Sequence, residues 1–193
     1  FDITAVPTHV EVTVVLPGGT LDGFKDLPTG DRASILPGVN GLVTLQGILA
    51  PKADVKITLT AGSVVRDTLS TALSDINYGF TGVETLTYTF TTTQPRYLNV
   101  TADLAKTVDV YADVTLEPLT LRAGNAIWTD NIIDVNDASK VTDNWGVTVD
   151  TDADVNFDLK VNIQDLALVG GNMDLTSAAA YGTWVPVLPV PAP

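Results

Sequence analysis

Residues 154–165 read DVNFDLKVNIQD, and this segment decides the C-terminal part of the fold. Oxygen-bearing side chains stand at its first, third, fifth, ninth and twelfth positions. Calcium is held by hard oxygen ligands, and a loop of about twelve residues with ligands at these positions and a carbonyl at the seventh can surround it. The spacing therefore predicts a calcium-binding loop. The expected ligands are the side chains of Asp154, Asn156, Asp158, Asn162 and Asp165 and the backbone carbonyl of Lys160.

One position departs from this pattern. Leu159 occupies the sixth place, where the chain turns with a positive φ that Gly adopts without strain. We therefore expect backbone strain at Leu159. Val161, at the eighth place, is expected to pair with a partner loop. The alternative interpretation of the segment is an Asp- and Asn-rich turn that only caps the following helix.

A second segment, DNIIDVND at residues 130–137, matches the latter half of such a loop. Its first half, residues 125–129, departs: Trp128 stands where an oxygen donor is expected, and one residue is extra. Asn131 takes the turn position and tolerates left-handed geometry better than Leu159 does. The alternative is a pseudo-loop without an ion that keeps only a packing role. The expected ligands are Asn125, Asp130, the Ile132 carbonyl, Asp134 and Asp137.

Each of these loops leads into a short amphipathic segment, residues 134–146 and 162–172, with apolar residues at helical spacing. The pair resembles a dockerin module, two loop–helix repeats with Asp at the twelfth position, over residues 123–175. The resemblance implies binding to a cohesin-type domain through the outer helix faces. Those faces would include Ser139, Lys140, Leu168 and Val169.

The chain before residue 120 is rich in Val, Thr, Tyr and Phe, punctuated by Gly, Pro, Asn and Asp. Such residues suit a pleated strand, and short strands at this spacing are typical of an antiparallel sandwich. Residues 8–16 alternate polar and apolar, which predicts a further half-buried strand with His9 on its polar side. The other expected strands are 43–49, 53–60, 78–83, 84–92, 96–102 and 107–119.

The predicted fold class is mainly β: an antiparallel β-sandwich followed by a small α-helical module of paired EF-hand-like loops. Asp and Asn become frequent after Gly124, so we expect a sandwich with an N-terminal strand over 1–122, a calcium module over 123–180 and an extended Pro-rich tail over 181–193. The pieces VTLQG, YGFTGV and PRYL resemble the carboxypeptidase-regulatory or transthyretin-like sandwich. That resemblance implies a scaffold and brings no peptidase chemistry.

The net charge of −13 has two interpretations, solubility and the binding of divalent cations. The second is favoured by clustering, because ten Asp and only two Lys lie between Asp130 and Asp174. An acidic chain without a basic stripe is a poor partner for nucleic acid. No apolar run of about 18 residues predicts a membrane-spanning helix. The absence of Cys excludes disulfides and thiolate ligands.

The residues that catalysis commonly requires are scarce, so we expect no enzymatic activity. His9 is the single histidine, which leaves nucleophile–base arrangements without a base, and no phosphate-binding or dinucleotide motif occurs. Carbohydrate binding is an open alternative, although strand aromatics are more often core residues. Its candidate platforms are Tyr78, Tyr88, Tyr97, Tyr111 and Trp184. Asn99-Val100-Thr101 is a glycosylation sequon, relevant if a glycosylating host secretes the chain.

The two ends of the chain suggest how it assembles. Residues 1–6 and 184–193 are apolar, so they are expected to pack on their own domain or on a neighbouring subunit, where the 8–16 strand would extend another sheet. The chain starts at Phe1, which suggests removal of a signal peptide. The leading hypothesis is thus a secreted, calcium-stabilised subunit of an extracellular filament or surface layer made of copies of itself. The alternatives are a dockerin-bearing adaptor for a cohesin partner and a carbohydrate-binding module.

Overall fold

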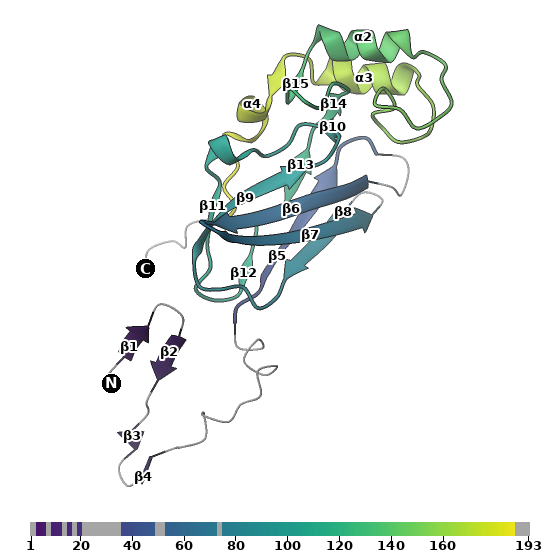
Figure 1. Cartoon of the computed structure of the whole chain (residues 1–193). Helices are drawn as coiled ribbons and strands as arrows, with labels where there is room; N and C mark the ends of the chain where they lie inside the picture. Colours follow the sequence, from purple (N-terminus) through teal and green to yellow (C-terminus); the bar gives the residue numbers. More distant parts are fainter. Residues whose placement is uncertain are drawn as a thin grey trace. The chain divides into compact units, whose positions relative to one another are not determined.

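The computed structural model describes residues 3–6, 9–12, 15–16, 19–20, 36–48, 53–72 and 75–187, which fall into two compact units, residues 1–35 and 36–193. In the first unit, β1 (Ile3–Val6) pairs antiparallel with β2 (His9–Val12), and β3 (Val15–Leu16) pairs with β4 (Gly19–Thr20) (Figure 1). The strand expected at 8–16 thus corresponds to β2 and β3. Residues 8, 13 and 14 and the surroundings of the His9 side chain lie outside the described part.

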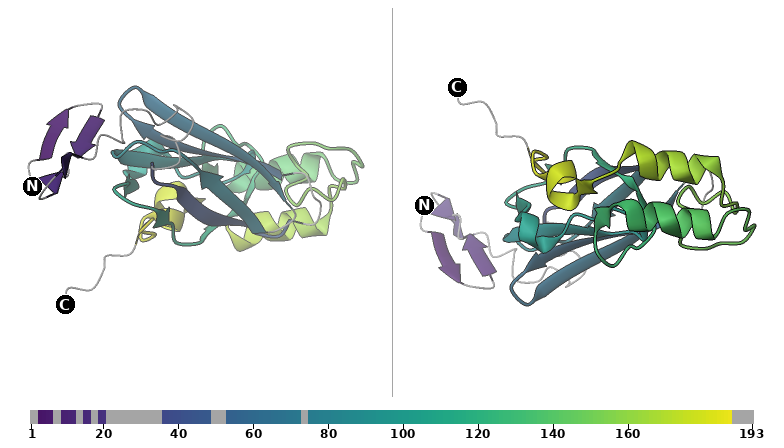
Figure 2. Two further views of the ribbon diagram at one scale, coloured as in Figure 1. Left: turned by 90° about the horizontal axis from the view of Figure 1, so that it is seen from below. Right: turned by 90° about the horizontal axis from the view of Figure 1, so that it is seen from above.

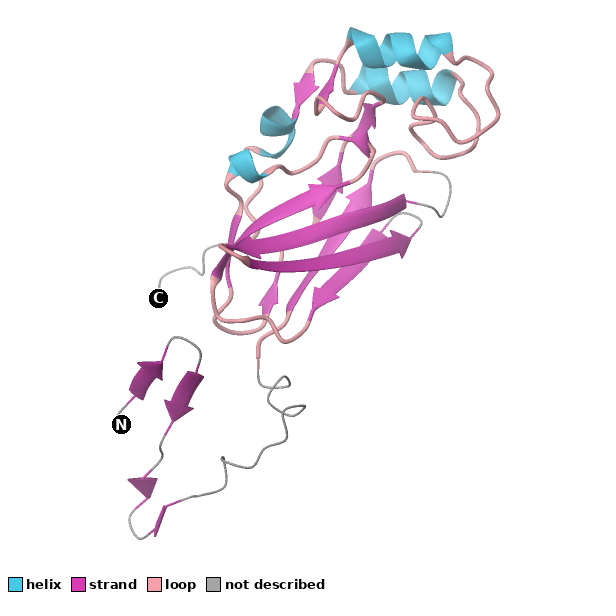
Figure 3. Cartoon of the chain, viewed as in Figure 1, coloured by secondary structure: helices cyan, strands magenta, loops and turns pink. Residues whose placement is uncertain are grey.

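The second unit is mainly β, as Figure 3 shows by colour. Its first sheet is built around β5 (Val39–Leu45). β8 (Asp75–Phe80) pairs antiparallel with one edge of β5, while β12 (Val114–Thr115) and β13 (Leu119–Leu121) pair parallel with the other edge. The segment expected as one strand over 107–119 is therefore divided among several short strands, because Pro118 and the polar turn after Asp109 interrupt it.

The second sheet has the order β11 (Thr107–Asp109), β9 (Thr87–Thr93), β6 (Ala53–Ala61) and β7 (Val64–Ala72), all antiparallel. Strand β7 was not predicted from the sequence. Its pairing with β6 rests on the tight turn at Gly62, where φ is +58°, a value that Gly adopts readily. The segment expected as a strand over 96–102 is also shorter, because β10 contains only Arg96–Tyr97.

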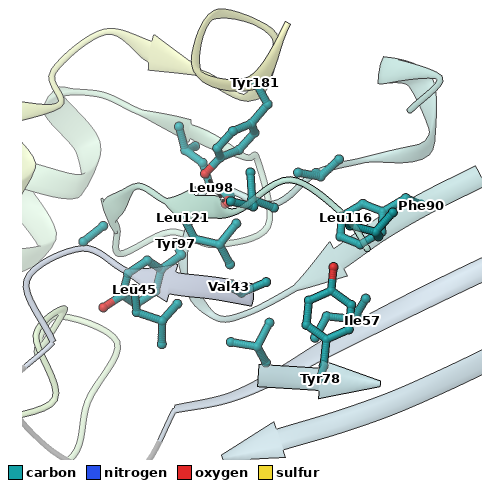
Figure 4. Close-up of a cluster of buried hydrophobic side chains, with 14 of the residues drawn as sticks. Val43, Leu45, Ile57, Tyr78, Phe90, Tyr97, Leu98, Leu116, Leu121 and Tyr181 are labelled. Carbon is teal, nitrogen blue, oxygen red and sulfur yellow. Dashed lines mark hydrogen bonds between the residues drawn. The ribbon is translucent and has the colours of Figure 1, made fainter. Parts of the chain in front are cut away.

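The core lies between the two sheets and follows the alternation of the strands. On β6, for example, Val55, Ile57 and Leu59 are all fully buried, while Lys56 between them is exposed. The rings of Tyr78 and Phe90, from different sheets, lie 6.4 Å apart. Figure 4 shows this cluster and its continuation towards Tyr97, Leu98 and Tyr181, which belong to the helical end of the unit. One apolar core therefore serves both the strands and the helices.

The C-terminal part adds helices and small ribbons beyond the sheets, and α2 and α3 lie side by side at one end of the unit (Figure 2). None of the helices in the described residues is long and apolar enough to cross a bilayer. The elements are η2 (Ala102–Leu104), α2 (Val135–Asp143), α3 (Ile163–Gly171) and α4 (Ser177–Tyr181), with β10 paired to β14 (Ala123–Asn125) and β15 (Ile132–Ile133) paired to β16 (Leu175–Thr176).

The described part of the tail packs on the sandwich of its own chain. The ring of Trp184 lies 5.2 Å from that of Phe90, and Lys106 Nζ donates hydrogen bonds to the carbonyls of Gly182 (2.9 Å) and Trp184 (2.6 Å). Residues 188–193 lie outside the described part. The expected boundary near residues 121–124 coincides with no break between compact units, because residues 36–193 form one. A separately folding module at 123–180 stays a prediction.

Candidate functional site

The second loop, residues 154–165, is closed by its own acidic side chains. Asp154 Oδ1 accepts a hydrogen bond from the Asp158 N–H at 3.1 Å, and its Oδ2 accepts one from the Leu159 N–H at 2.9 Å. Asp165 Oδ1 accepts from the Asn156 N–H at 3.3 Å, and its Oδ2 from the Asn162 N–H at 2.9 Å. The two fully buried carboxylates thus face into the loop from its two ends.

The remaining predicted ligands of the second loop line the same turn. Asn156 Oδ1 accepts from the Asp158 N–H at 3.0 Å, and Asp158 Oδ1 accepts from the Lys160 N–H at 2.8 Å. The Lys160 carbonyl accepts from Asn162 Nδ2 at 3.3 Å. Leu159 has a φ of +67°, so the strain expected at this position is present. Phe157 also takes a positive φ, +60°, which the sequence did not indicate.

Helix α3 begins directly from this loop. Asn162 is its N-cap, and its Oδ1 accepts a hydrogen bond from the Gln164 N–H at 2.7 Å. In turn, Asp165 Oδ2 accepts a hydrogen bond from the backbone N–H of Asn162, which completes a capping box. Asn162 and Asp165 therefore cap the helix and belong to the predicted ligand set at the same time. These contacts are compatible both with a calcium-binding loop and with the alternative interpretation, a turn that only caps the following helix.

The environment of the second loop disfavours the charged form of its buried carboxylates. Burial raises the pKa of Asp154 from 3.8 to about 6, and the charges of Asp165 and Asp158 add to the rise. Burial also raises the pKa of Asp165. Two buried carboxylates that repel each other are stabilised by a cation between them. The donor set, carboxylate, amide and carbonyl oxygen, is the one that Ca²⁺ prefers.

The described residues nevertheless contain no preformed metal site made of carboxylates alone. No group of three or more His, Cys, Asp or Glu side chains in the described ranges is arranged to hold a metal ion. A site in the second loop would therefore depend on Asn156, Asn162 and the Lys160 carbonyl in addition to its carboxylates. Asn156 and Lys160 differ in exposure, since the former is buried and the latter exposed.

The first loop, residues 125–137, repeats the construction around the N-terminus of α2. Asp137 Oδ1 accepts from the Ile127 N–H and its Oδ2 from the Asp134 N–H, both at 2.7 Å. Asp137 therefore plays the part that Asp165 plays in the second loop, and Asp134 caps α2 as Asn162 caps α3. Asn131, with φ +56°, matches Leu159 as the left-handed turn residue. The two loops are structural repeats.

The two loops differ at their first ligand position. Asn125 is fully buried, and the orientation of its amide that satisfies its hydrogen bonds has the nitrogen donating to the carbonyls of Ile127 (3.1 Å) and Ile132 (3.2 Å). The Ile132 carbonyl, a predicted ligand, is thus bonded within the chain. Asp130 Oδ1 accepts from the Ile132 N–H at 3.2 Å. Trp128, which stands where an oxygen donor was expected, is 43% exposed.

The outer faces of the helices differ from the sequence prediction. Val169 is fully buried and Leu168 packs against the core, so neither forms an outer face. The sandwich covers this side of α3, which the helical period alone did not show. Ser139 is exposed and Lys140 partly so. Large apolar side chains instead lie exposed at the ends and turns of the helical part: Val135 (66%), Trp145 (53%), Val149 (59%), Leu159 (54%) and Ile163 (63%).

The candidate aromatic platforms for carbohydrate are mostly core residues. Tyr78, Tyr88 and Tyr97 are buried, and Trp184 packs on Phe90, whereas Tyr111 is 71% exposed. One hollow on the described surface holds about 370 Å³. It is lined by Arg122, Gly171, Asn172, Met173, Leu175, Ala179 and Ala180. None of the tyrosines lines it.

No protein-family model and no curated protein matches this chain. Its fold is similar to a chain in the crystal structure of the Coh3ScaB–XDoc_M1ScaA complex, an N-terminal interface mutant of a type II cohesin–X-dockerin complex from Acetivibrio cellulolyticus. The identity is 17%, the TM-score 0.54, and the match covers 74% of this chain and 98% of that chain. This likeness concerns the fold alone. The match covers 74% of 193 residues, which is 143 residues. This is more than the 125 residues up to the end of β14, so the similarity includes residues after Asn125.

Proposed function

We propose that this chain is a non-enzymatic, extracellular protein–protein docking module. In this proposal a β-sandwich carries two loop–helix repeats that Ca²⁺ stabilises, and the exposed side of the repeats binds a partner. The observation that carries the proposal is the equivalence of Asp137 and Asp165. Each closes a loop, caps a helix and lies fully buried at the predicted twelfth position.

The second loop is the proposed principal calcium site, held by Asp154, Asn156, Asp158, the Lys160 carbonyl and Asp165, with Asn162 acting directly or through water. When bound, the ion would supply charge neutralisation, and its binding free energy would add to the stability of the fold. In the first loop, Asn125, Asp130, the Ile132 carbonyl, Asp134 and Asp137 remain the proposed ligands of a second ion. The Asn125 amide bonds favour a weaker site there.

A dockerin-like role supplies the partner class, a cohesin-type domain, and the similar crystal structure contains a cohesin–X-dockerin complex. Val135 and Ile163 support a contact surface, because they hold equivalent places at the first residues of α2 and α3 and are 66% and 63% exposed. Each residue therefore offers an aliphatic side chain that a partner could bury.

Calorimetric titration of metal-stripped protein with Ca²⁺ tests the cation part of the proposal. We expect heat of binding and a rise in melting temperature, both strongly reduced in Asp154→Asn. Asp174→Asn is the control, because Asp174 is exposed and lies outside both loops. Neither heat nor a melting shift in the wild-type chain would overturn the calcium assignment.

Binding to a panel of purified cohesin-type domains tests the docking part. We expect a complex by size-exclusion chromatography that Val135→Asp and Ile163→Asp weaken, while Val65→Asp, on the exposed side of β7, leaves it unchanged. The self-assembling filament, which was the leading hypothesis from the sequence, is the second candidate function. Fibres that form without any partner and dissolve in chelator would favour it over docking, and retention on polysaccharide would favour the carbohydrate-binding alternative.

A further inference from the structure

A single arginine on β10 makes three contacts with the second loop and the residues just before it. Arg96 Nη1 donates a hydrogen bond to the Asp154 carbonyl at 2.9 Å, and Nη2 forms an ion pair with the Asp150 carboxylate. The guanidinium carbon lies 4.2 Å from the centre of the Phe157 ring. The three contacts reach across more than 50 positions of sequence, from β10 to the loop.

The Arg96 side chain is buried beside the loop. The Arg96 side chain is only 9% exposed, and its backbone takes a φ of +71°. The Phe157 ring also stacks on Tyr97, with ring centres 6.2 Å apart and planes inclined by 11°. Two neighbouring residues of β10 thus contact the Phe157 ring, one through a cation and one through its own ring, and desolvation strengthens the cation contact.

We propose that Arg96 is a positioning residue that keeps the start of the second loop folded on β10 whether or not a cation is bound. The inference rests on the proposed calcium site for one of its consequences, the effect on affinity. A loop that is already ordered loses less conformational entropy on binding than a free one. Arg96 would therefore raise the affinity of the loop for Ca²⁺ through order, although its positive charge acts in the opposite direction.

Ordering of the loop by Arg96 would strengthen Ca²⁺ binding, whereas its positive charge would weaken it. Substitution of Arg96 therefore shows which of the two effects is larger. If charge repulsion dominated, Arg96→Met would tighten Ca²⁺ binding. If positioning dominates, Arg96→Met weakens binding by about tenfold or more, as loss of a partner that orients metal ligands usually does. Arg96→Lys should weaken it nearly as much, because an ammonium group lacks the planar fork that reaches Asp150 and the Asp154 carbonyl together.

The experiment combines Ca²⁺ titration by calorimetry with amide hydrogen exchange of metal-stripped protein. Arg66→Met is the matched control, because Arg66 forms an ion pair with Glu84 (2.9 Å) within the sandwich. We expect residues 150–158 to be protected in the metal-stripped wild type and in the control, and to exchange freely in Arg96→Met and Arg96→Lys. Unchanged protection with unchanged or tighter binding would overturn the proposal.

Two further comparisons keep the test decisive. Should Arg96→Met fail to fold, Asp150→Asn removes the ion pair at a 62% exposed partner and is expected to raise exchange in the same residues. No change in that variant would count against Arg96. If the wild type binds no Ca²⁺, the proposed cation site fails, while the exchange comparison still decides whether Arg96 orders the loop.

Discussion

Helix α3 meets the turn after β5 where Leu168 lies directly over Gly47. A Cβ atom at Gly47 would be 2.6 Å from Leu168 Cδ2, closer than side-chain carbons approach, and Gly47 has a φ of +71°. The sandwich and the helical part are therefore in contact without room for a methyl group. The Asn172 amide reinforces this contact, donating to Gln46 Oε1 (2.7 Å) and to the Ala123 carbonyl (2.8 Å).

Gly47→Ala should destabilise the 36–193 unit more than Gly62→Ala does. Both positions have a positive φ, but a Cβ at Gly62 meets nothing within 4 Å. The control then measures backbone strain, about 1–2 kcal/mol, and Gly47→Ala adds a packing conflict of about 1–3 kcal/mol. Urea unfolding of the two variants gives the difference. Equal free energies of unfolding would contradict the close contact with Leu168.

The stability of metal-free protein should depend on the protonation of Asp154. Because its pKa rises from 3.8 to about 6 on folding, the folded state binds this proton more tightly than the unfolded chain. The free energy of unfolding then falls as pH rises through that window. Thermal unfolding of metal-stripped protein between pH 4 and 8 measures this. We expect a smaller slope for Asp154→Asn, and an identical slope would show that other groups cause it.

Tyr181→Phe should be costly although it removes one oxygen atom. The buried Tyr181 hydroxyl donates to the Leu98 carbonyl and accepts from the Arg122 N–H, both at 2.9 Å. Its loss leaves the carbonyl and the N–H without their partner, at a cost of about 1–3 kcal/mol. Tyr111→Phe is the control, since Tyr111 is 71% exposed. Chemical denaturation that finds the two variants equally stable would refute this role of the hydroxyl.

Asn99 should stay unmodified in protein that folds before it meets an oligosaccharide transferase. Its side chain is buried, and Oδ1 accepts a hydrogen bond from the Gln94 N–H at 2.6 Å. A glycan attached at Nδ2 would have to displace the atoms that cover this buried side chain. Mass spectrometry of protein secreted from a glycosylating host is expected to find an unmodified peptide. Full occupancy at Asn99 in a stable, folded product would contradict the buried environment.

The features that the sequence predicted are those set by neighbours in the chain. Alternating Asp and Asn, a turn residue and an Asp three places into the helix are local relations. The structure contains both helices where they were expected, and it contains the cap of α3 that the alternative interpretation named. The strands at β6 and β9 followed from runs of β-branched and aromatic residues. In each case, the pattern and the element occupy the same few residues.

The missed features depend on contacts between distant parts of the chain. The parallel pairing of β12 and β13 with β5, and the strand β7, cannot be obtained from local composition. The burial of Val169 depends on Gly124, whose close approach to the Val169 backbone leaves only 3.0 Å for an added Cβ. The three contacts of Arg96 are of the same kind, since sequence alone gives no sign of its partners.

Both ends of the 36–187 body flank one short segment of the sandwich. The Gly38 carbonyl accepts a hydrogen bond from the Val114 N–H (2.9 Å), and the Pro186 carbonyl accepts one from the Glu117 N–H (2.8 Å). Helices α2 and α3 lie at the opposite end of this body (Figure 1). Tension applied through the flanking chain would therefore pass across β12 and its neighbours and leave the helices unloaded. A partner bound to α2 and α3 would therefore meet an unchanged surface while tension acts on the flanking chain.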